Sequence, residues 1–328
     1  MFHPSMSRDE GDRRLKAASL FCGCGGLDLG AEGGFNYLGD HYGDNGIDVI
    51  YANEINKRAA RLYEANFGRV PDCRDICTVD SKDIPDVDIV MGGFPCQSFS
   101  VAAEGTKRLG IKDERGRLFF EMCRVIREKQ PKCFVAENVK GLLTANDGEA
   151  YPLIMSEFRG CGYRVVSSLM NASEYGVPQK RERVIMVGIR NDLPVDFDFS
   201  SVFVNKDVVP LSAVLEDDVP LKYHYSKESI DKVKRSGKRK FRVQDPDGPC
   251  ITIGSHIWKT SLNSSDPVLR TKDGYRRFTP REVARVQSFP DSYVLCGRKE
   301  HQYHALGNAV PPVMAWYVFN RIGKILSG

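Results

Sequence analysis

The sequence lacks the features that would place it in a membrane or on the secretory pathway. No stretch approaches the roughly 18 uninterrupted apolar residues that a transmembrane helix needs. The opening residues MFHPSMSRDEGDRR contain no apolar segment of the kind found in signal peptides. We therefore expect a cytoplasmic protein with no membrane partner. Residues 1–16 are expected to form a polar N-terminal extension, in which Met6 offers a second start.

The ten cysteines do not make a zinc motif. Cys22 and Cys24 lie inside a glycine-rich turn, while Cys73 and Cys77 are separated by three residues, so no Cys-x-x-Cys pair is present. No pair of histidines has finger spacing either. A cytoplasmic chain keeps its thiols reduced, which argues against disulfides. We expect no metal, and most of the cysteines should be small apolar core residues.

A strong net charge is also missing, since the chain carries only +4 at pH 7. The positive charge is nevertheless concentrated in residues 222–242, where nine Lys or Arg face two acidic residues. One interpretation is a solvated helix with a frayed end. The other is a surface that contacts phosphates. The six candidates for such contacts are Lys232, Lys234, Arg235, Lys238, Arg239 and Lys240.

Residues 17–190 alternate strand patterns with helix patterns. The strand-like runs are AASLF, DVIYANE, DIVMGG, CFVAENV, YRVVSSLMNA and RVIMVGIR, and helical spacing is clearest in INKRAARLYEANF and GRLFFEMCRVIREKQ. This alternation predicts an α/β fold with a doubly wound, mostly parallel sheet. Such sheets bind ligands at the carboxyl ends of their strands.

The strand–helix alternation stops after Arg190. Residues 191–300 hold short β-like pieces rich in Asp, Pro, Ser and Lys, which predicts a second, smaller, β-rich domain. Within it, Thr279-Pro280-Arg-Glu282 has the pattern of a helix N-cap with a capping box. The apolar helix predicted within residues 301–328 returns to the first domain, so this domain comprises residues 17–190 and 301–328.

A glycine-rich turn, FCGCGG, follows the first strand at residues 21–26. Glycines let a ligand approach the backbone closely, although such turns are common after strands. The second strand ends in Glu54, which could accept hydrogen bonds from ribose hydroxyls. Asp75 follows the next strand-like stretch and could accept from an adenine amino group. Together these positions predict a ligand that contains adenosine.

The stretch GFPCQ places Cys96 after a strand, in a loop stiffened by Pro95. A thiolate in a polarised, accessible setting is a nucleophile. The alternative is a buried cysteine in a turn. Glu137, in the run CFVAENV, ends another strand, where partial desolvation would help it hold a proton. Its alternative role is a helix cap or a salt bridge to a neighbouring arginine.

The stretch QKRERV begins a strand at residues 179–184. Strand alternation would put Gln179, Arg181 and Arg183 on one face. Two arginines on one face could bind a carbonyl oxygen, a carboxylate or a phosphate. A surface-exposed face is the alternative.

These pieces resemble the DNA (cytosine-5) methyltransferases, chiefly those of bacterial restriction-modification systems. The resemblance covers residues 21–312, nearly the whole chain. Departures are GDHYGDNGID at 39–48, which looks like an insertion, and Ile55, where many members of the family carry an aromatic residue. The matching pieces, in family order, are FCGCGG, ANE, RDI, GFPCQSFS, DERGRLFFE, ENVKG, QKRERV, RFTPREVARVQSFPDSY and LGNAVPP.

The resemblance implies a catalytic centre at Cys96, Glu137 and Arg183. The Cys96 thiolate would attack C6 of cytosine and make C5 nucleophilic. Glu137 would protonate or hydrogen-bond N3, and Arg183 would bind O2, with Arg181 in support. Gln97 and the loop after it would close over a base flipped out of the duplex.

The resemblance also implies S-adenosyl-L-methionine as the methyl donor and a fold of the S-adenosylmethionine-dependent methyltransferase type. The expected partners are double-stranded DNA, read by residues 191–300 as a target-recognition domain, and a cognate restriction endonuclease. The protein itself is expected to be a monomer. The positions implied for cofactor binding are Phe21, Gly23, Gly25, Gly26, Glu54, Asp75, Pro95, Leu118 and Asn308.

Three other functions remain as alternatives. Some proteins of this fold methylate transfer RNA, but they carry a Cys-Phe-Thr element that this chain lacks. A catalytically silent DNA-binding protein would be expected to lose Cys96, Glu137 or an arginine of QKRER. An NAD enzyme would need the full Gly-x-Gly-x-x-Gly spacing, which residues 21–26 do not have.

Overall fold

The computed structural model describes residues 14–95, 117–204, 206–236, 242–259, 266–272 and 274–327. Five of the predicted site residues lie outside these ranges. They are Cys96, Gln97, Lys238, Arg239 and Lys240.

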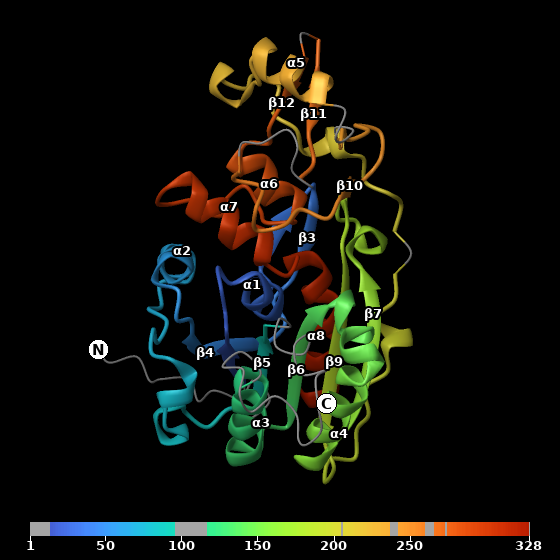
Figure 1. Cartoon of the computed structure of the whole chain (residues 1–328). Coiled ribbons are helices and arrows are strands. Elements are labelled where there is room, and N and C mark those ends of the chain that lie inside the picture. The colour runs from blue at the N-terminus through green and yellow to red at the C-terminus, as the bar shows by residue number, and fades with distance from the viewer. Residues whose placement is uncertain are drawn as a thin grey trace, which may run out of the picture.

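A six-stranded sheet forms the centre of the molecule (Figure 1). Four neighbouring strands run parallel, and β9 runs antiparallel to both of its neighbours. The predicted mostly parallel α/β sheet is therefore confirmed. In spatial order the strands are β4 (Ile47–Asn53), β1 (Leu15–Leu20), β5 (Ile89–Gly93), β6 (Cys133–Val139), β9 (Glu182–Arg190) and β7 (Tyr163–Asn171).

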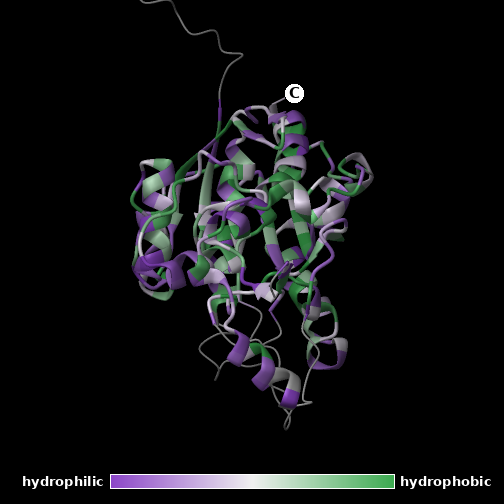
Figure 2. Cartoon of the chain, turned by 90° about the horizontal axis from the view of Figure 1, so that it is seen from above, coloured by the Kyte–Doolittle hydropathy of each residue, from purple (hydrophilic) through white to green (hydrophobic). Residues whose placement is uncertain are grey.

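Helices cover both faces of this sheet. Ala17 of β1 belongs to the hydrophobic cluster that includes α1 and α8, whereas Ala18 belongs to the cluster that includes α3 and α4. Successive side chains of a strand point to opposite faces, so the sheet is buried on both sides. Figure 2 shows the apolar strands between helices with hydrophilic outer surfaces. The helices are α1 (Gly26–Glu32), α2 (Lys57–Phe67), α3 (Arg117–Lys129), α4 (Ala150–Gly160) and α8 (Pro312–Ser327).

The segment interpreted as an insertion contributes to a small antiparallel hairpin of β2 (Phe35–Tyr37) and β3 (Asp40–Tyr42). The hairpin packs on α8, because Tyr42 meets the edge of Trp316 and the Trp316 Nε1 donates a hydrogen bond to the Gly43 carbonyl at 2.7 Å. The hairpin is thus held against the final helix of the chain.

Residues 191–300 contain short elements, as the sequence indicates. The helix α5 and the hairpin β11–β12 project away from the sheet at the top of Figure 1, whereas β10 pairs with β8. The helices α6 and α7 share a hydrophobic cluster with Cys24 and Leu62 of the N-terminal half. The elements are β8 (Gln179–Lys180), α5 (Lys227–Ser236), β10 (Cys250–Ile251), β11 (Leu269–Thr271), β12 (Gly274–Arg276), α6 (Pro280–Val286) and α7 (Lys299–Asn308).

The predicted capping box at the start of α6 is confirmed. The Thr279 side chain accepts from the Glu282 backbone N–H, and the Glu282 side chain accepts from the Thr279 backbone N–H. Pro280 occupies the first turn, where its missing N–H is not needed. Within the described ranges, no helix combines the length and the apolar character needed to span a bilayer.

The packing around Gly188 predicts a large effect of one methyl group on stability. A Cβ added at this position of β9 would lie 2.0 Å from the ring of Phe134, which is fully buried. Overpacking of this kind costs about 1–3 kcal/mol. Gly188→Ala should therefore lower the free energy of unfolding by that amount in urea titrations. Gly160→Ala is the matched control, because nothing lies within 4 Å of its added Cβ. Equal stability of the two variants would contradict this packing.

Candidate active site at the carboxyl ends of the parallel strands

The predicted site residues follow four neighbouring parallel strands. The glycine loop (residues 21–25) follows β1, Glu54 follows β4, Pro95 follows β5, and Glu137 lies near the end of β6. Carboxyl ends of parallel strands meet at one edge of a sheet, so these positions share that edge. The topology thus places Glu137, which was predicted to be catalytic, at the same edge as the glycine loop and Glu54, which were predicted to bind the cofactor.

Glu54 holds the glycine loop in place. Its Oε2 accepts a hydrogen bond from the Gly23 backbone N–H at 2.9 Å, and its Oε1 accepts from the Asn56 N–H at 2.7 Å. Burial raises the pKa of this carboxyl. A carboxylate has about four lone-pair positions, so each oxygen still has room for one more donor.

The three glycines of the loop serve different purposes. A Cβ added at Gly23 would have nothing within 4 Å, so this position opens onto free space. An added Cβ would lie 2.2 Å from the Phe67 ring at Gly25 and 2.3 Å from the Val310 carbonyl oxygen at Gly26. Gly25 and Gly26 therefore have a packing role, whereas Gly23 leaves space for a ligand.

The remaining residues predicted for the cofactor lie around this loop. Phe21 has a left-handed backbone (φ 55°), which is uncommon without glycine and is found at functional sites. Phe21 and Leu118 are partly buried and pack against the same hydrophobic cluster. The Asp75 side chain caps a short 3₁₀ helix by accepting from the Cys77 N–H at 3.0 Å. Asn308 is exposed at the end of α7.

Glu137 and Arg183 form a buried ion pair. The Arg183 Nε lies 2.9 Å from Glu137 Oε1, and the two residues are 9% and 8% exposed. The antiparallel register places Val139 opposite Arg183. Glu137 lies two residues before Val139 on the same face, so it is the diagonal neighbour of Arg183. Burial raises the pKa of Glu137, and the positive charges of Arg183 and Arg181 oppose this shift. Of the roles considered for Glu137, the structure shows the salt bridge and also the desolvation that favours a proton.

Two residues that the sequence did not single out support this pair. Gly93 lies opposite Glu137 in the sheet, and a Cβ there would be 2.8 Å from Glu137 Oε2. The Asn138 amide donates to the Phe94 carbonyl at 3.0 Å and so holds the backbone two residues before Cys96. Their only signal in the sequence is their position, beside GFPC and inside ENV.

Arg181 lies under the site, where it is almost fully buried. Among the described residues, its guanidinium donates to three backbone carbonyls: Ile253 at 2.9 Å, Gly307 at 3.0 Å and Ala309 at 2.9 Å. Gln179, Arg181 and Arg183 are buried and Lys180 is exposed, so the predicted alternation is confirmed and a surface-exposed face is excluded. Arg181 influences Glu137 through its charge, which lowers the pKa of that carboxyl.

The basic segment is only partly described. Lys232 and Arg235 are exposed on α5, which fits either a solvated helix or a surface that contacts phosphates. Lys234 belongs to the same helix, but its side chain is outside the description.

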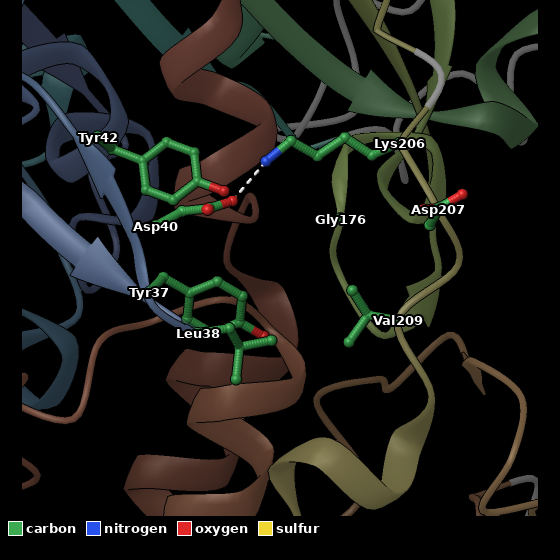
Figure 3. A pocket seen from close by; sticks show the side chains of 8 residues that line it. All are labelled: Tyr37, Leu38, Asp40, Tyr42, Gly176, Lys206, Asp207 and Val209. Atoms are coloured by element: carbon green, nitrogen blue, oxygen red, sulfur yellow. Dashed lines mark hydrogen bonds and ion pairs between the residues drawn. The ribbon is translucent and has the colours of Figure 1, made fainter.

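A cavity of about 420 Å³ lies elsewhere, between the β2–β3 hairpin and residues 206–209. Figure 3 shows Lys206 reaching across it to Asp40 beside the ring of Tyr42. None of the predicted site residues that the structure describes lines this cavity. The carboxyl edge of the sheet therefore remains the candidate active site.

Comparison with known proteins agrees with the arrangement at this edge. The family model described as C-5 cytosine-specific DNA methylase matches residues 15–324, almost the whole chain. The chain belongs to this family. It is accordingly a DNA (cytosine-5)-methyltransferase, as the order of motifs predicted.

Curated type II methyltransferases resemble this methylase over most of their length. M.NgoFVII of Neisseria gonorrhoeae is 35% identical over 326 residues, covering 90% of this chain and 83% of the relative. M.HhaI of Haemophilus parahaemolyticus is 32% identical over 329 residues and covers 95% of both chains. A role in restriction-modification is consistent with these relatives.

Solved structures share the fold of this methylase. The Dnmt2 methyltransferase of S. pombe superposes with a TM-score of 0.74 and 22% identity, over 95% of this chain and 98% of that one. The Entamoeba histolytica methyltransferase EhMeth has a TM-score of 0.75 and 17% identity, over 94% and 99%. These likenesses show the methyltransferase fold.

The contact between Gly93 and Glu137 yields a test of the methylase site. Gly93→Ala would place a methyl group 2.8 Å from Glu137 Oε2 and so displace the carboxyl. We expect kcat to fall about tenfold or more, equivalent to about 1.4 kcal/mol, with unchanged cofactor affinity. Gly141→Ala is the control, because its added Cβ would make an ordinary contact of 3.8 Å with Val139. A Gly93→Ala enzyme with the kcat of the parent would show that the position of Glu137 does not matter.

Proposed function

We propose that this enzyme transfers the methyl group of S-adenosyl-L-methionine to C5 of a flipped-out cytosine in a short, specific site of duplex DNA, through a covalent bond between Cys96 and C6. The observation that carries this proposal is the buried Glu137–Arg183 pair at the carboxyl edge of the sheet. Glu137 lies on β6, the strand next to β5, which leads into GFPCQ, and Arg183 lies on β9, on the other side of β6.

The proposed chemistry begins with a bond from the Cys96 sulfur to C6. The electron pair of the C5–C6 double bond makes C5 nucleophilic, while negative charge develops toward N3 and O2. The raised pKa of Glu137 favours a protonated carboxyl that can donate to N3. Arg183 would bind O2. After C5 takes the methyl group, loss of the C5 proton returns electrons to the ring and breaks the C6–S bond.

The positioning of Cys96 is inferred from the residues just before it. Asn138 holds the carbonyl of Phe94, and the ring of Pro95 fixes the φ angle of Pro95 itself. The approach to the thiol is thus anchored to β6, the strand that carries Glu137. A nucleophile and a proton donor anchored to one scaffold keep their separation, which oriented catalysis requires.

The residues around the glycine loop fit the adenosine and methionine parts of the cofactor. Gly23 opens onto free space, and Glu54 keeps acceptor capacity for ribose hydroxyls. Phe21 would lie against the adenine, and Asp75 would accept from its amino group. The cofactor supplies an electrophilic methyl group, and these residues hold and orient it.

The biological setting is inferred from the relatives. We propose that residues 191–300 read the DNA sequence, while exposed Lys232, Arg235 and their basic neighbours contact phosphates without selecting bases. A cognate restriction endonuclease would cut the same site when it is unmethylated. The methylase would act as a monomer in the cytoplasm.

Glu54 provides the test of the cofactor site. Glu54→Ala should weaken the binding of S-adenosylmethionine by about 1.5–3 kcal/mol, because it removes hydrogen bonds to a charged group and frees the Gly23 N–H. Glu64→Ala is the control, since this acid is exposed on α2. Calorimetry that gives the same affinity for both variants would remove Glu54 from the site.

Trapping on a fluorinated base tests the covalent mechanism. With fluorine at C5, attack by Cys96 and methyl transfer can proceed, but fluorine cannot leave as a cation. Duplex DNA with 5-fluorocytosine at the target position should therefore form a complex with the enzyme that survives denaturing electrophoresis in the presence of S-adenosylmethionine. Cys96→Ser and plain cytosine should give none.

The same assay separates the alternatives. An enzyme acting on transfer RNA would be trapped on the equivalent RNA and not on DNA. A silent DNA-binding protein would form no covalent complex on either. A parent enzyme that methylates DNA without ever being trapped would contradict the roles proposed for Cys96, Glu137 and Arg183.

A further inference from the structure

A row of polar side chains lies beneath the glycine loop, apart from the residues that the proposed mechanism uses. Asp28, in the first turn of α1, is completely buried. Tyr63 of α2 lies beside it, and Ser19 of β1 approaches it from the sheet. Farther out, Arg69 and Glu32 continue the row toward solvent.

The row is coupled mechanically to the loop. The Tyr63 hydroxyl donates to Asp28 Oδ1 at 3.0 Å. The ring of the same tyrosine lies 3.1 Å from the position that a Cβ of Gly25 would occupy. The loop therefore packs on the tyrosine that is hydrogen-bonded to Asp28, which connects Asp28 to the loop proposed to bind the cofactor.

One carboxyl oxygen of Asp28 has no partner. Within the described part of the chain, Asp28 Oδ2 and Ser19 Oγ are both buried without a hydrogen-bond partner. Complete burial without an ion pair among these residues favours the neutral carboxyl, although the hydroxyls of Ser19 and Tyr63 lower its pKa. Burial raises the pKa of Asp28 to about 7, which agrees with this geometry.

Among the residues that the structure describes, Asp28 has no ion-pair partner of its own. Arg69 lowers the pKa of Asp28 through its charge, but its Nη2 is paired with Glu32 Oε1 at 2.7 Å, and Glu32 opposes the effect. The loop adds only thiols, and burial raises the pKa values of both Cys22 and Cys24. The other groups that face Asp28 are hydroxyls: Ser19 from β1, Tyr63 from α2 and, more remotely, Tyr293 after α6.

We propose that Asp28 is the counter-charge for the cationic methyl donor: it is protonated in the empty enzyme and releases its proton when a sulfonium compound binds over the glycine loop. This inference rests on the proposed use of S-adenosylmethionine. The demethylated product, S-adenosylhomocysteine, has a neutral sulfur and would leave Asp28 protonated. Asp28 is thus a specificity-determining residue that favours the charged substrate over the neutral product through its charge, without touching the reacting atoms.

The proposal predicts the direction in which the affinity for a cation changes with pH. Because the carboxyl is neutral below its raised pKa, binding of a cation there must expel a proton, and affinity rises as the pH rises through that pKa. If the bound cation lowers the pKa by about one unit, affinity increases about fivefold between pH 6 and pH 8.5. At pH 6.5 the release should be about half a proton per cofactor bound.

Titration calorimetry in buffers of different ionisation enthalpy measures this release directly. With the parent enzyme at pH 6.5, S-adenosylmethionine should release about half a proton more than S-adenosylhomocysteine does. The free amino group of each compound also titrates, near pH 8 in an amino acid. Asp28→Asn is therefore the reference, because it keeps the shape and the acceptor for Tyr63 and cannot ionise.

Glu64→Gln is the matched control. It removes a carboxylate that is exposed on α2. We expect Glu64→Gln to keep both the proton release and the pH dependence of affinity, and Asp28→Asn to lose both. If Asp28→Asn does not fold, the difference in proton release between the two compounds on the parent enzyme still tests the proposal.

The outcomes separate this inference from the proposed function. Tight binding of S-adenosylmethionine with equal proton release in the parent and Asp28→Asn would overturn the role of Asp28 alone. Equal release with the cationic and the neutral compound would do the same. If S-adenosylmethionine does not bind at any pH, the proposed cofactor and the inference fail together.

Discussion

A single buried guanidinium ties together parts of the chain that are far apart in sequence. Arg181 donates to the carbonyl of Ile253, which is 72 positions away, and to that of Ala309, which is 128 positions away. Burial of a charge is costly unless hydrogen bonds compensate it, and Arg181 Nε has no partner among the described residues, so the carbonyls that do accept from Arg181 must stay where they are. The start of β9, the segment near β10 and the turn before α8 therefore form one rigid base beneath Glu137 and Arg183.

Burial has the same effect on two carboxyls in the proposed site, one near the target base and one near the methyl donor. Glu137 is desolvated next to β5 and paired with Arg183, and burial raises its pKa. Asp28 is desolvated beneath the glycine loop, and burial raises its pKa as well. Glu137 faces the position proposed for the target base, and Asp28 lies below the position proposed for the methyl donor. In both places burial thus favours the neutral form of a carboxyl near which charge would develop or arrive.

The glycine loop is a shared part of both arrangements. Its backbone is held from three directions, by Glu54 at Gly23, by the Tyr293 hydroxyl at the Cys24 carbonyl, and by Phe67 against Gly25. Because these three residues come from separate elements, the loop is set by the tertiary structure as a whole. A preorganised loop needs little rearrangement to receive a ligand, which favours binding.

Much of the fold and of the site was predictable from the sequence alone. Alternating apolar patterns and capping signals such as Thr279-Pro280 depend on neighbouring residues, and the order of motifs from FCGCGG to GNAVPP indicated the family. Only the tertiary structure decided that Gly93 makes room for Glu137, that Asn138 holds Phe94, and that Asp28 is buried without an ion-pair partner among the described residues. These features depend on contacts between residues of different strands and helices, which have no periodic signal in one sequence. Local sequence patterns therefore determined the elements and the chemistry they carry, whereas packing across the sheet determined which charges are buried and which have partners.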